Sequence, residues 1–479
     1  MSGAITTEQT LSQLITKLSK SNMDDESQEK MDVSINTPFG ELSVDLYEFE
    51  SARNKAINQM KTKCEISAGS RLNEIKLARA FFESKKYTEY GKFWPSTFGC
   101  LIKSHLDTYF ENDRLVEEFF CDGNDLVQAR YMDMTLSNGK SLRFITEGIR
   151  LYEMADGSKI VLTLSVDRDN DHFINIYSNQ PYDCKNMIDD FLADFFKRGP
   201  LKGQFFDIDY NFMDRNPAVN DLLVWDSDVK QILEREIVQY FDIMPSLKKM
   251  GMPTSRGLIL SGPPGTGKTM YAKALAASCD VTTILISAEM VKQRYDVKSA
   301  FILARKLAPC LIIIEDIDTA GTVSRKFSNH PILGEYLQSM DGIEANDGVV
   351  VLATTNHTEN IDPAITDRPG RFDRIINVDL PSKRQRMGII LNLLNKFDHD
   401  ELSDGFVLRM AKKTEGLSGA WIKECIHSSF IQASYDGRDK ISQSDIEDAV
   451  SEVIERRGHV FVPTKVLPNA NPIANGYTA

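Results

Sequence analysis

The chain has 479 residues and a formal net charge of −13, from 56 basic and 69 acidic residues. It is longer than a single compact core usually allows, and its 42% hydrophobic and 26% charged residues are typical of globular proteins. An acidic chain repels phosphate backbones, which disfavours a general nucleic-acid role. The longest apolar run, Cys310–Ile314, is far shorter than a membrane span, and the N-terminus is polar. We therefore expect a cytoplasmic protein with no signal peptide and no transmembrane segment.

The N-terminal part of the chain contains no motif that names a chemistry. Residues 1–35 are polar, and we expect a flexible segment in which Leu11–Leu18 has the spacing of a short docking helix. We expect residues 36–205 to form a mixed α+β domain that binds a partner or substrate. Its predicted helices span residues 73–84, 97–110 and 187–196, and its predicted strands span 158–167 and 172–177.

From residue 206 the pattern changes to short apolar strands that alternate with helices. Continuous apolar strands of this kind indicate a parallel sheet covered on both faces. We expect an αβα sandwich over residues 206–382, a small α-helical lid over 383–460 and a flexible tail over 461–479. The fold class is therefore α/β. The predicted strands span residues 257–261, 282–287, 310–314, 348–354 and 375–378, after a helix over 228–240.

One glycine-rich segment follows the first of these strands and satisfies GxxxxGK[ST]. Its glycines allow backbone N–H groups to surround phosphate oxygens at the start of a helix, whose N-terminus is partly positive. Lys268 is expected to reach the β- and γ-phosphates, and the Thr269 hydroxyl to bind Mg²⁺. The cofactors would be ATP and Mg²⁺. The segment consists of Gly262, Pro263, Pro264, Gly265, Thr266, Gly267, Lys268 and Thr269.

Polar residues also end two later apolar strands. Glu315 and Asp316 follow the apolar run 311–314. We expect Glu315 to order Mg²⁺ and its water ligands, and Asp316 to polarise the attacking water. Asn356 ends the next strand, where a neutral amide could hold the water or the γ-phosphate without adding negative charge.

Taken in order, these motifs resemble the AAA ATPase family. The segments IIIEDID, ATTN and DRPGRFD follow the phosphate loop, and ATTN to RPGRFD corresponds to the second region of homology of that family. GLSGA, which contains Gly419 and Ala420, resembles the signature near adenine and ribose. The resemblance covers roughly half of the chain and includes the FtsH and proteasomal ATPase modules. It implies a homo-oligomeric ring, commonly of six subunits, in which Arg368 and Arg371 match arginine fingers supplied to the neighbouring subunit.

The sequence departs from the family pattern at two places, which bear on the rate of ATP hydrolysis and on how a protein client is gripped. The order Glu315-Asp316, where most relatives read Asp-Glu, resembles the Bcs-type translocase branch and suggests slower hydrolysis. Residues 287–297 lack the aromatic–hydrophobic–Gly triplet with which unfoldases grip their substrates. Tyr295 is the nearest candidate for a gripping aromatic residue, and it fits a core position of the following helix equally well. The sequence therefore does not decide whether the protein threads a peptide client through the ring.

Three functions are compatible with the sequence. The leading one is ATP hydrolysis that drives remodelling or translocation of a protein client. The second is a nucleotide-gated scaffold with little turnover, which the exchanged acidic residues keep open. A nucleic-acid motor or loader comes third, because the chain is acidic and shows no basic run. Its seven scattered cysteines have no CxxC spacing, so we expect no structural zinc.

Overall fold

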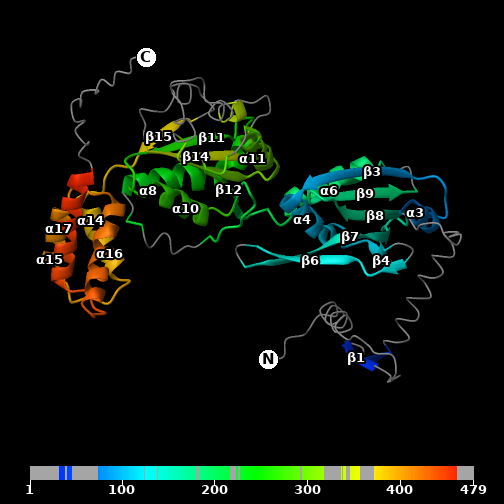
Figure 1. Ribbon diagram of the computed structural model, residues 1–479. Coiled ribbons are helices and arrows are strands. Elements are labelled where there is room, and N and C mark those ends of the chain that lie inside the picture. Colours follow the sequence, from blue (N-terminus) through cyan, green and yellow to red (C-terminus); the bar gives the residue numbers. More distant parts are fainter. Residues whose placement is uncertain are drawn as a thin grey trace, which may run out of the picture. The chain divides into compact units, whose positions relative to one another are not determined.

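The computed structural model (Figure 1) divides the chain into two compact units, which we describe separately. Unit 1 comprises Met1–Asp133 and Arg143–Ala193, and unit 2 comprises Met134–Leu142 and Asp194–Ala479. The expected N-terminal docking helix and the tail over 461–479 lie outside the described residues. The structure describes residues 32–37, 40–45, 74–122, 125–136, 139–179, 183–215, 223–224, 227–287, 289–291, 294–317, 336, 338–340, 346–356 and 372–460.

Unit 1 contains a seven-stranded sheet in the order β3-β9-β8-β7-β4-β5, with β6 paired to β7. The two strands predicted over residues 158–167 and 172–177 are confirmed as the antiparallel pair β8 and β9. The other strands of this sheet were not predicted. A separate antiparallel pair is formed by β1 (Asp32–Thr37) and β2 (Gly40–Asp45). The sheet strands are β3 (Thr88–Pro95), β4 (Arg114–Asp122), β5 (Asp125–Val127), β6 (Arg130–Thr135), β7 (Ser141–Glu153), β8 (Lys159–Val166) and β9 (Asp171–Ser178).

Helices cover both faces of this sheet because successive strand residues point to opposite sides. On one face, α3 packs against Tyr177 of β9. On the other face, Gly99 of α4 lies against His172 of β9, and a Cβ added to Gly99 would come within 2.5 Å of the His172 Cβ. The single helix predicted over residues 97–110 is wrong, because the chain tightens at His105, whose N–H donates to the Ile102 carbonyl at 3.1 Å. The helices are α3 (Glu74–Phe82), α4 (Ser96–Ser104), α5 (Leu106–Tyr109) and α6 (Cys184–Arg198).

Unit 2 is built on a six-stranded parallel sheet in the order β10-β12-β13-β14-β11-β15. The predicted parallel sheet and all five of its predicted strands are confirmed. The sequence missed β10, because three residues are too few to show a periodicity. The strands are β10 (Phe205–Asp207), β11 (Arg256–Ser261), β12 (Thr282–Ser287), β13 (Cys310–Glu315), β14 (Val349–Thr355) and β15 (Arg374–Asn377).

Helices lie on both faces of the parallel sheet, as its buried strands require. Figure 1 shows α8 (Ser227–Leu233) and α10 (Lys268–Ser278) side by side, and both contribute to the same core. The helix predicted over 228–240 continues as the π-helix η1 (Glu234–Val238) and then α9 (Gln239–Lys249). On the opposite face lies α11 (Arg294–Lys306), which contacts β12 and β13.

The helices expected after Pro381 are present and enclose a core of their own. Leu394, Met410, Ile422 and Val453 are fully buried in it. The buried Arg386 donates to the carbonyl of Ala411 at 2.8 Å and ties two helices together. No helix within the described ranges combines the length and apolar character that a bilayer crossing requires. The lid helices are α14 (Lys383–Leu394), α15 (Asp404–Lys413), α16 (Gly419–Tyr435) and α17 (Gln443–Val460).

Candidate nucleotide site

The glycine-rich loop joins β11 to α10, and its backbone explains why it needs glycine. Gly265 and Gly267 have φ angles of +77° and +96°, which residues with a side chain rarely adopt. A Cβ on Gly262 would lie 2.0 Å from the Val378 carbonyl oxygen. The loop therefore packs tightly against the chain just after β15 and leads into α10, whose N-terminus is partly positive and favours an anion.

Lys268, the first residue of α10, places a buried positive charge at this loop. Its side chain is 5% exposed. The ammonium donates to the carbonyls of Gly262 and Pro263 at 2.8 and 2.9 Å, and to Asn356 Oδ1 at 2.8 Å. These three acceptors match the three hydrogens of an ammonium group. The charge is thus fixed where the ends of β11 and β14 meet.

Asn356 connects this lysine to the acidic end of β13. Its Nδ2 donates to Asp316 Oδ1 at 2.9 Å, so ammonium, amide and carboxylate form one hydrogen-bonded chain. Asp316 has φ of +49°, and its N–H donates to Thr354 Oγ1 at 3.0 Å. Aspartate adopts this left-handed conformation more readily than glutamate does. The local backbone therefore favours the Glu-Asp order seen in the sequence.

Glu315, the last residue of β13, faces Thr269 on α10. The Thr269 hydroxyl lies near the Glu315 carboxylate, whose Oε1 is buried and has no hydrogen-bond partner among the described residues. Burial raises the pKa of the Glu315 carboxyl, and the charge of Lys273 and the nearby Thr269 hydroxyl offset only part of that effect. An unpaired carboxylate oxygen beside a hydroxyl is a donor set that suits Mg²⁺. The residues present therefore fit the expected metal.

Next to the loop lies a pocket of about 400 Å³. Its walls come from α8, from residues 374–381 and from the lid, with Thr266 representing the glycine-rich loop. This volume is in the range of small-molecule sites. The sequence did not mark Val229, Ile232 or Ile389 as site residues, although all three line the pocket. They are ordinary apolar residues of helices, so their type alone carries no functional signal.

The start of α16 brings the lid into contact with the glycine-rich loop. The N–H of Ala420 donates to the Gly265 carbonyl at 3.1 Å, and Gly419 lines the pocket. A Cβ on Gly265 would lie 2.8 Å from both the Ala420 Cβ and the Ser418 hydroxyl oxygen. The two lid residues expected near the nucleotide are therefore placed beside the loop.

Two further expectations concern residues away from this cluster. Arg368 and Arg371 lie outside the described residues, so the structure does not place them. Tyr295 lies on α11 and is 68% exposed. The interpretation of Tyr295 as a core residue is therefore wrong, and its ring is accessible to another molecule.

Comparison with known families agrees with this geometry. Residues 258–380 match the model of the "ATPase family associated with various cellular activities (AAA)". This range begins in β11 and extends through the glycine-rich loop, the acidic residues of β13 and Asn356 to the segment that lines the pocket.

Curated relatives match nearly half of the chain. It is 35% identical over 235 residues to "ATP-dependent zinc metalloprotease FTSH 9, chloroplastic/mitochondrial" of Oryza sativa subsp. japonica, which is 47% of this chain and 30% of that protein. It is 35% identical over 240 residues to the ATP-dependent zinc metalloprotease FtsH of Halothermothrix orenii, at 47% and 37% coverage. For FtsH 3 of Sphaerobacter thermophilus the identity is 34% over 243 residues, at 48% and 49% coverage. The chain thus spans less than half the length of these relatives.

Proposed function

Since residues 258–380 belong to the AAA family of P-loop ATPases, we propose that the chain is an ATP-driven remodeller of protein clients. The observation that carries this proposal is the hydrogen-bonded chain from Lys268 through Asn356 to Asp316, beside the Thr269–Glu315 pair. It brings a cation, a neutral amide and a carboxylate to one edge of a parallel sheet. Phosphoryl transfer needs this combination, because its catalysis rests on positioning and charge stabilisation.

We assign the roles within the site as follows. Lys268 neutralises the β- and γ-phosphates, and the backbone of residues 262–267 surrounds them. Thr269 and Glu315 hold Mg²⁺, which when bound neutralises phosphate charge. Asp316 orients and polarises the attacking water, while Asn356 holds that carboxylate and Lys268 in register.

The lid and the ring complete the proposal. Gly419 and Ala420 close the pocket on its lid side, so that a change at the phosphates moves the lid helices. Arg368 and Arg371 act on the nucleotide of the neighbouring subunit of a homo-oligomeric ring. Residues 36–205 select the client, residues 206–382 bind the nucleotide and residues 383–460 transmit the movement.

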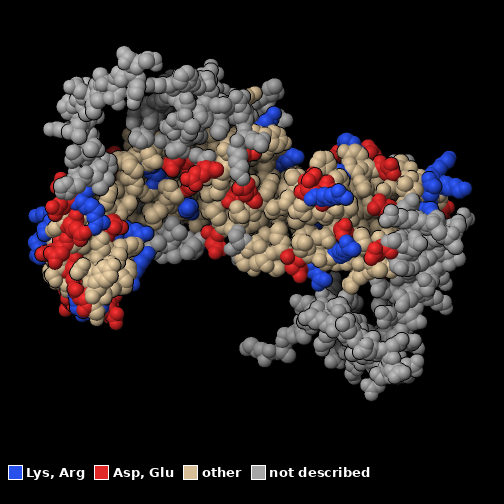
Figure 2. Space-filling view, in the orientation of Figure 1, with Lys and Arg blue, Asp and Glu red and all other residues tan. Residues whose placement is uncertain are grey.

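The proposal does not extend to the peptide hydrolysis in the relatives' names. A zinc metalloprotease helix typically reads HExxH, and none of the seven histidines in this sequence is followed by glutamate. A function as a nucleic-acid motor or loader is not favoured either. On the face shown in Figure 2, Lys and Arg of the described residues lie among Asp and Glu rather than in one basic stripe.

Phosphate release measured against protein concentration tests the proposal. We expect activity per subunit to rise with concentration as rings assemble, and size measurements with ATP present to show the same transition. Lys268→Ala should abolish hydrolysis by removing the phosphate-binding charge. Arg371→Ala should abolish hydrolysis while nucleotide binding remains, because the arginine acts on the neighbour's nucleotide. A wild-type chain that binds ATP tightly yet releases no phosphate at any concentration would instead support the nucleotide-gated scaffold.

A further inference from the structure

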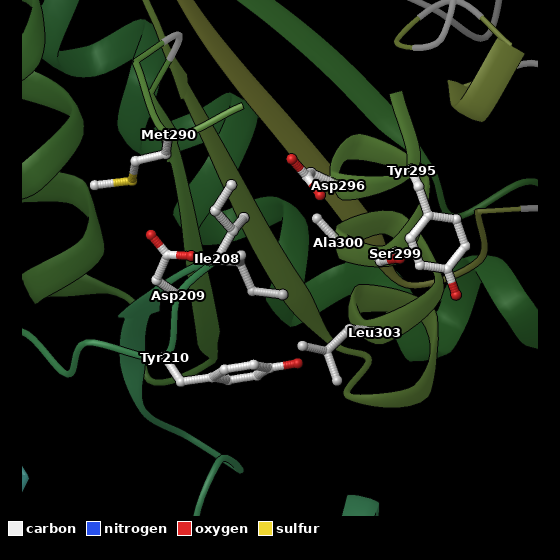
Figure 3. A pocket seen from close by; sticks show the side chains of 10 residues that line it. Ile208, Asp209, Tyr210, Met290, Tyr295, Asp296, Ser299, Ala300 and Leu303 are labelled. Carbon is white, nitrogen blue, oxygen red and sulfur yellow. The ribbon is translucent and has the colours of Figure 1, made fainter. Parts of the chain in front are cut away.

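A second pocket, of about 250 Å³, lies between the turn after β10 and helix α11. In Figure 3 the Tyr210 ring points toward Leu303, with Asp209 on the turn side of the pocket and Asp296 and Ala300 on the α11 side. The proposed nucleotide site does not use any of these residues. The pocket is smaller than sites for drug-sized ligands, so it suits one side chain rather than a nucleotide.

The turn that forms one wall is held in place by its own hydrogen bonds. Asp207 Oδ1 accepts the N–H groups of Asp209 and Asn211, each at 2.9 Å, and the Asp207 carbonyl accepts the N–H of Tyr210 at 3.0 Å. Tyr210 has φ of +63°, an uncommon conformation for a bulky residue. Its ring stacks on Phe206 at a centroid distance of 6.2 Å. The turn therefore presents Asp209 and the Tyr210 ring from a fixed backbone.

The chemistry of the lining is complementary to one kind of group. Two carboxylates, Asp209 and Asp296, and two phenol rings, Tyr210 and Tyr295, border the pocket, and none of the described residues that line it is lysine or arginine. Asp209 and Tyr295 are exposed, so the pocket opens to solvent on that side. Its floor is apolar, with the buried Ile284 among the lining residues. Carboxylates attract a cation, aromatic faces stabilise it and an apolar floor accommodates an aliphatic stem.

We infer that this pocket binds an arginine side chain of a client polypeptide. A guanidinium is planar, accepts stacking on tyrosine and donates bidentate hydrogen bonds to carboxylates, all of which the pocket offers together. The inference deepens the proposed function and rests on it, because it supposes that a polypeptide is the client. Tyr295 then contributes as one wall of an arginine pocket, which needs no aromatic–hydrophobic–Gly triplet.

Two peptides that differ at one atom test the inference. We would measure fluorescence anisotropy of an unstructured, otherwise neutral peptide carrying one arginine, and of the same peptide with neutral citrulline, on the full chain with Mg-ATP. The arginine peptide should bind at least about tenfold more tightly, as expected for a charge-assisted pair in a partly enclosed site. In the double variant Asp209→Asn, Asp296→Asn the preference should fall below about threefold.

Matched variants separate the pocket from general charge effects. Asp439→Asn removes an exposed lid carboxylate and should leave the preference unchanged. Tyr295→Ala should weaken the binding of the arginine peptide, and Tyr295→Phe should restore it, because the phenylalanine ring retains the aromatic face. Thermal unfolding of each variant checks that the fold is intact. Equal binding of the two peptides, or an arginine preference that survives the double variant, would overturn the inference.

The same samples separate the two proposals. If the wild type hydrolyses ATP but binds both peptides alike, the arginine pocket is wrong and the proposed ATPase function stands. If it shows the arginine preference and loses that preference in the double variant, yet releases no phosphate, the pocket stands. The motor function fails in that case.

Discussion

Each of the two units buries a lysine, and the two lysines differ in what surrounds them. Lys103 in unit 1 is 2% exposed and donates to the carbonyls of Thr146 and Ser165 at 2.7 and 2.9 Å. Lys268 in unit 2 is 5% exposed and donates to loop carbonyls and to Asn356. Burial is the same, but Lys103 bonds only to the strand framework. Lys268 bonds to a glycine-rich loop and to a polar side chain at the edge of a pocket.

This difference teaches that a buried charge marks a functional site only through its neighbours. Burial lowers the pKa of Lys103 to about 7, yet Lys103 lines neither the pocket beside the glycine-rich loop nor the pocket between the β10 turn and α11. We therefore regard Lys103 as structural and Lys268 as functional. Replacing each lysine should consequently affect different properties of the protein.

The largest effect is expected from Lys268→Ala. Loss of the charge at the phosphate-binding loop should lower the rate of phosphate release by at least about a hundredfold, the usual scale for removing a transition-state donor. The variant also loses the three hydrogen bonds of the buried ammonium, so part of its stability is lost with the activity. A coupled phosphate-release assay, with circular dichroism as the control for folding, measures both. A variant that retains more than a tenth of wild-type activity would contradict the assigned role.

Lys103→Ala should act on stability instead. It leaves the Thr146 and Ser165 carbonyls without their donor and opens a cavity, at a cost of about 3 kcal/mol. Urea unfolding of unit 1 measures this loss. Lys103→Met is the matched control, because it fills the volume and should cost less. ATP binding by unit 2 should be unchanged in both, and loss of hydrolysis without loss of stability would reverse our assignment.

His172, near Lys103, should make unit 1 sensitive to acid. Burial and the Lys103 charge lower its pKa to about 4, whereas an unfolded chain has a value of about 6.5. Between these values the unfolded state binds a proton that the folded state does not, so stability falls as pH drops from about 6.5 to about 4. The total loss is about 3 kcal/mol at most. Unfolding curves at stepped pH measure it, and His172→Gln should flatten the slope.

The same contrast explains how much could be predicted from the sequence. In unit 2 the functional residues lie in short contiguous motifs at strand ends, so the parallel sheet and the residues around Lys268 were predictable. In unit 1 charged residues are buried inside regular elements. Arg150 of β7 is 2% exposed and pairs with Glu118 and Asp107, each at 2.6 Å. A sequence-based prediction that assumes charged residues to be exposed therefore misses strands such as β4 and β7.

The two pockets are formed by tertiary contacts, which no local sequence pattern predicts. The pocket beside the glycine-rich loop joins α8, residues 374–381 and the lid, which are far apart in the sequence. The turn at Asp209 and Tyr210 becomes a pocket wall only because α11 lies opposite. Its residues are ordinary for a turn, apart from the left-handed Tyr210.

The smallest predicted effect concerns the acidic pair, and it sharpens the comparison within unit 2. The double variant Glu315→Asp, Asp316→Glu gives the Asp-Glu order expected from the family resemblance but places glutamate at a φ of +49°. We expect a stability loss of about 1 kcal/mol from that conformation. If the native order slows hydrolysis, turnover should nevertheless rise severalfold, since the water-polarising carboxylate gains one methylene of reach. Glu315→Asp alone is the control, because it shortens the proposed metal ligand without altering residue 316. Lower turnover in the double variant than in this control would mean that the backbone at residue 316 requires aspartate for catalysis as well as for folding.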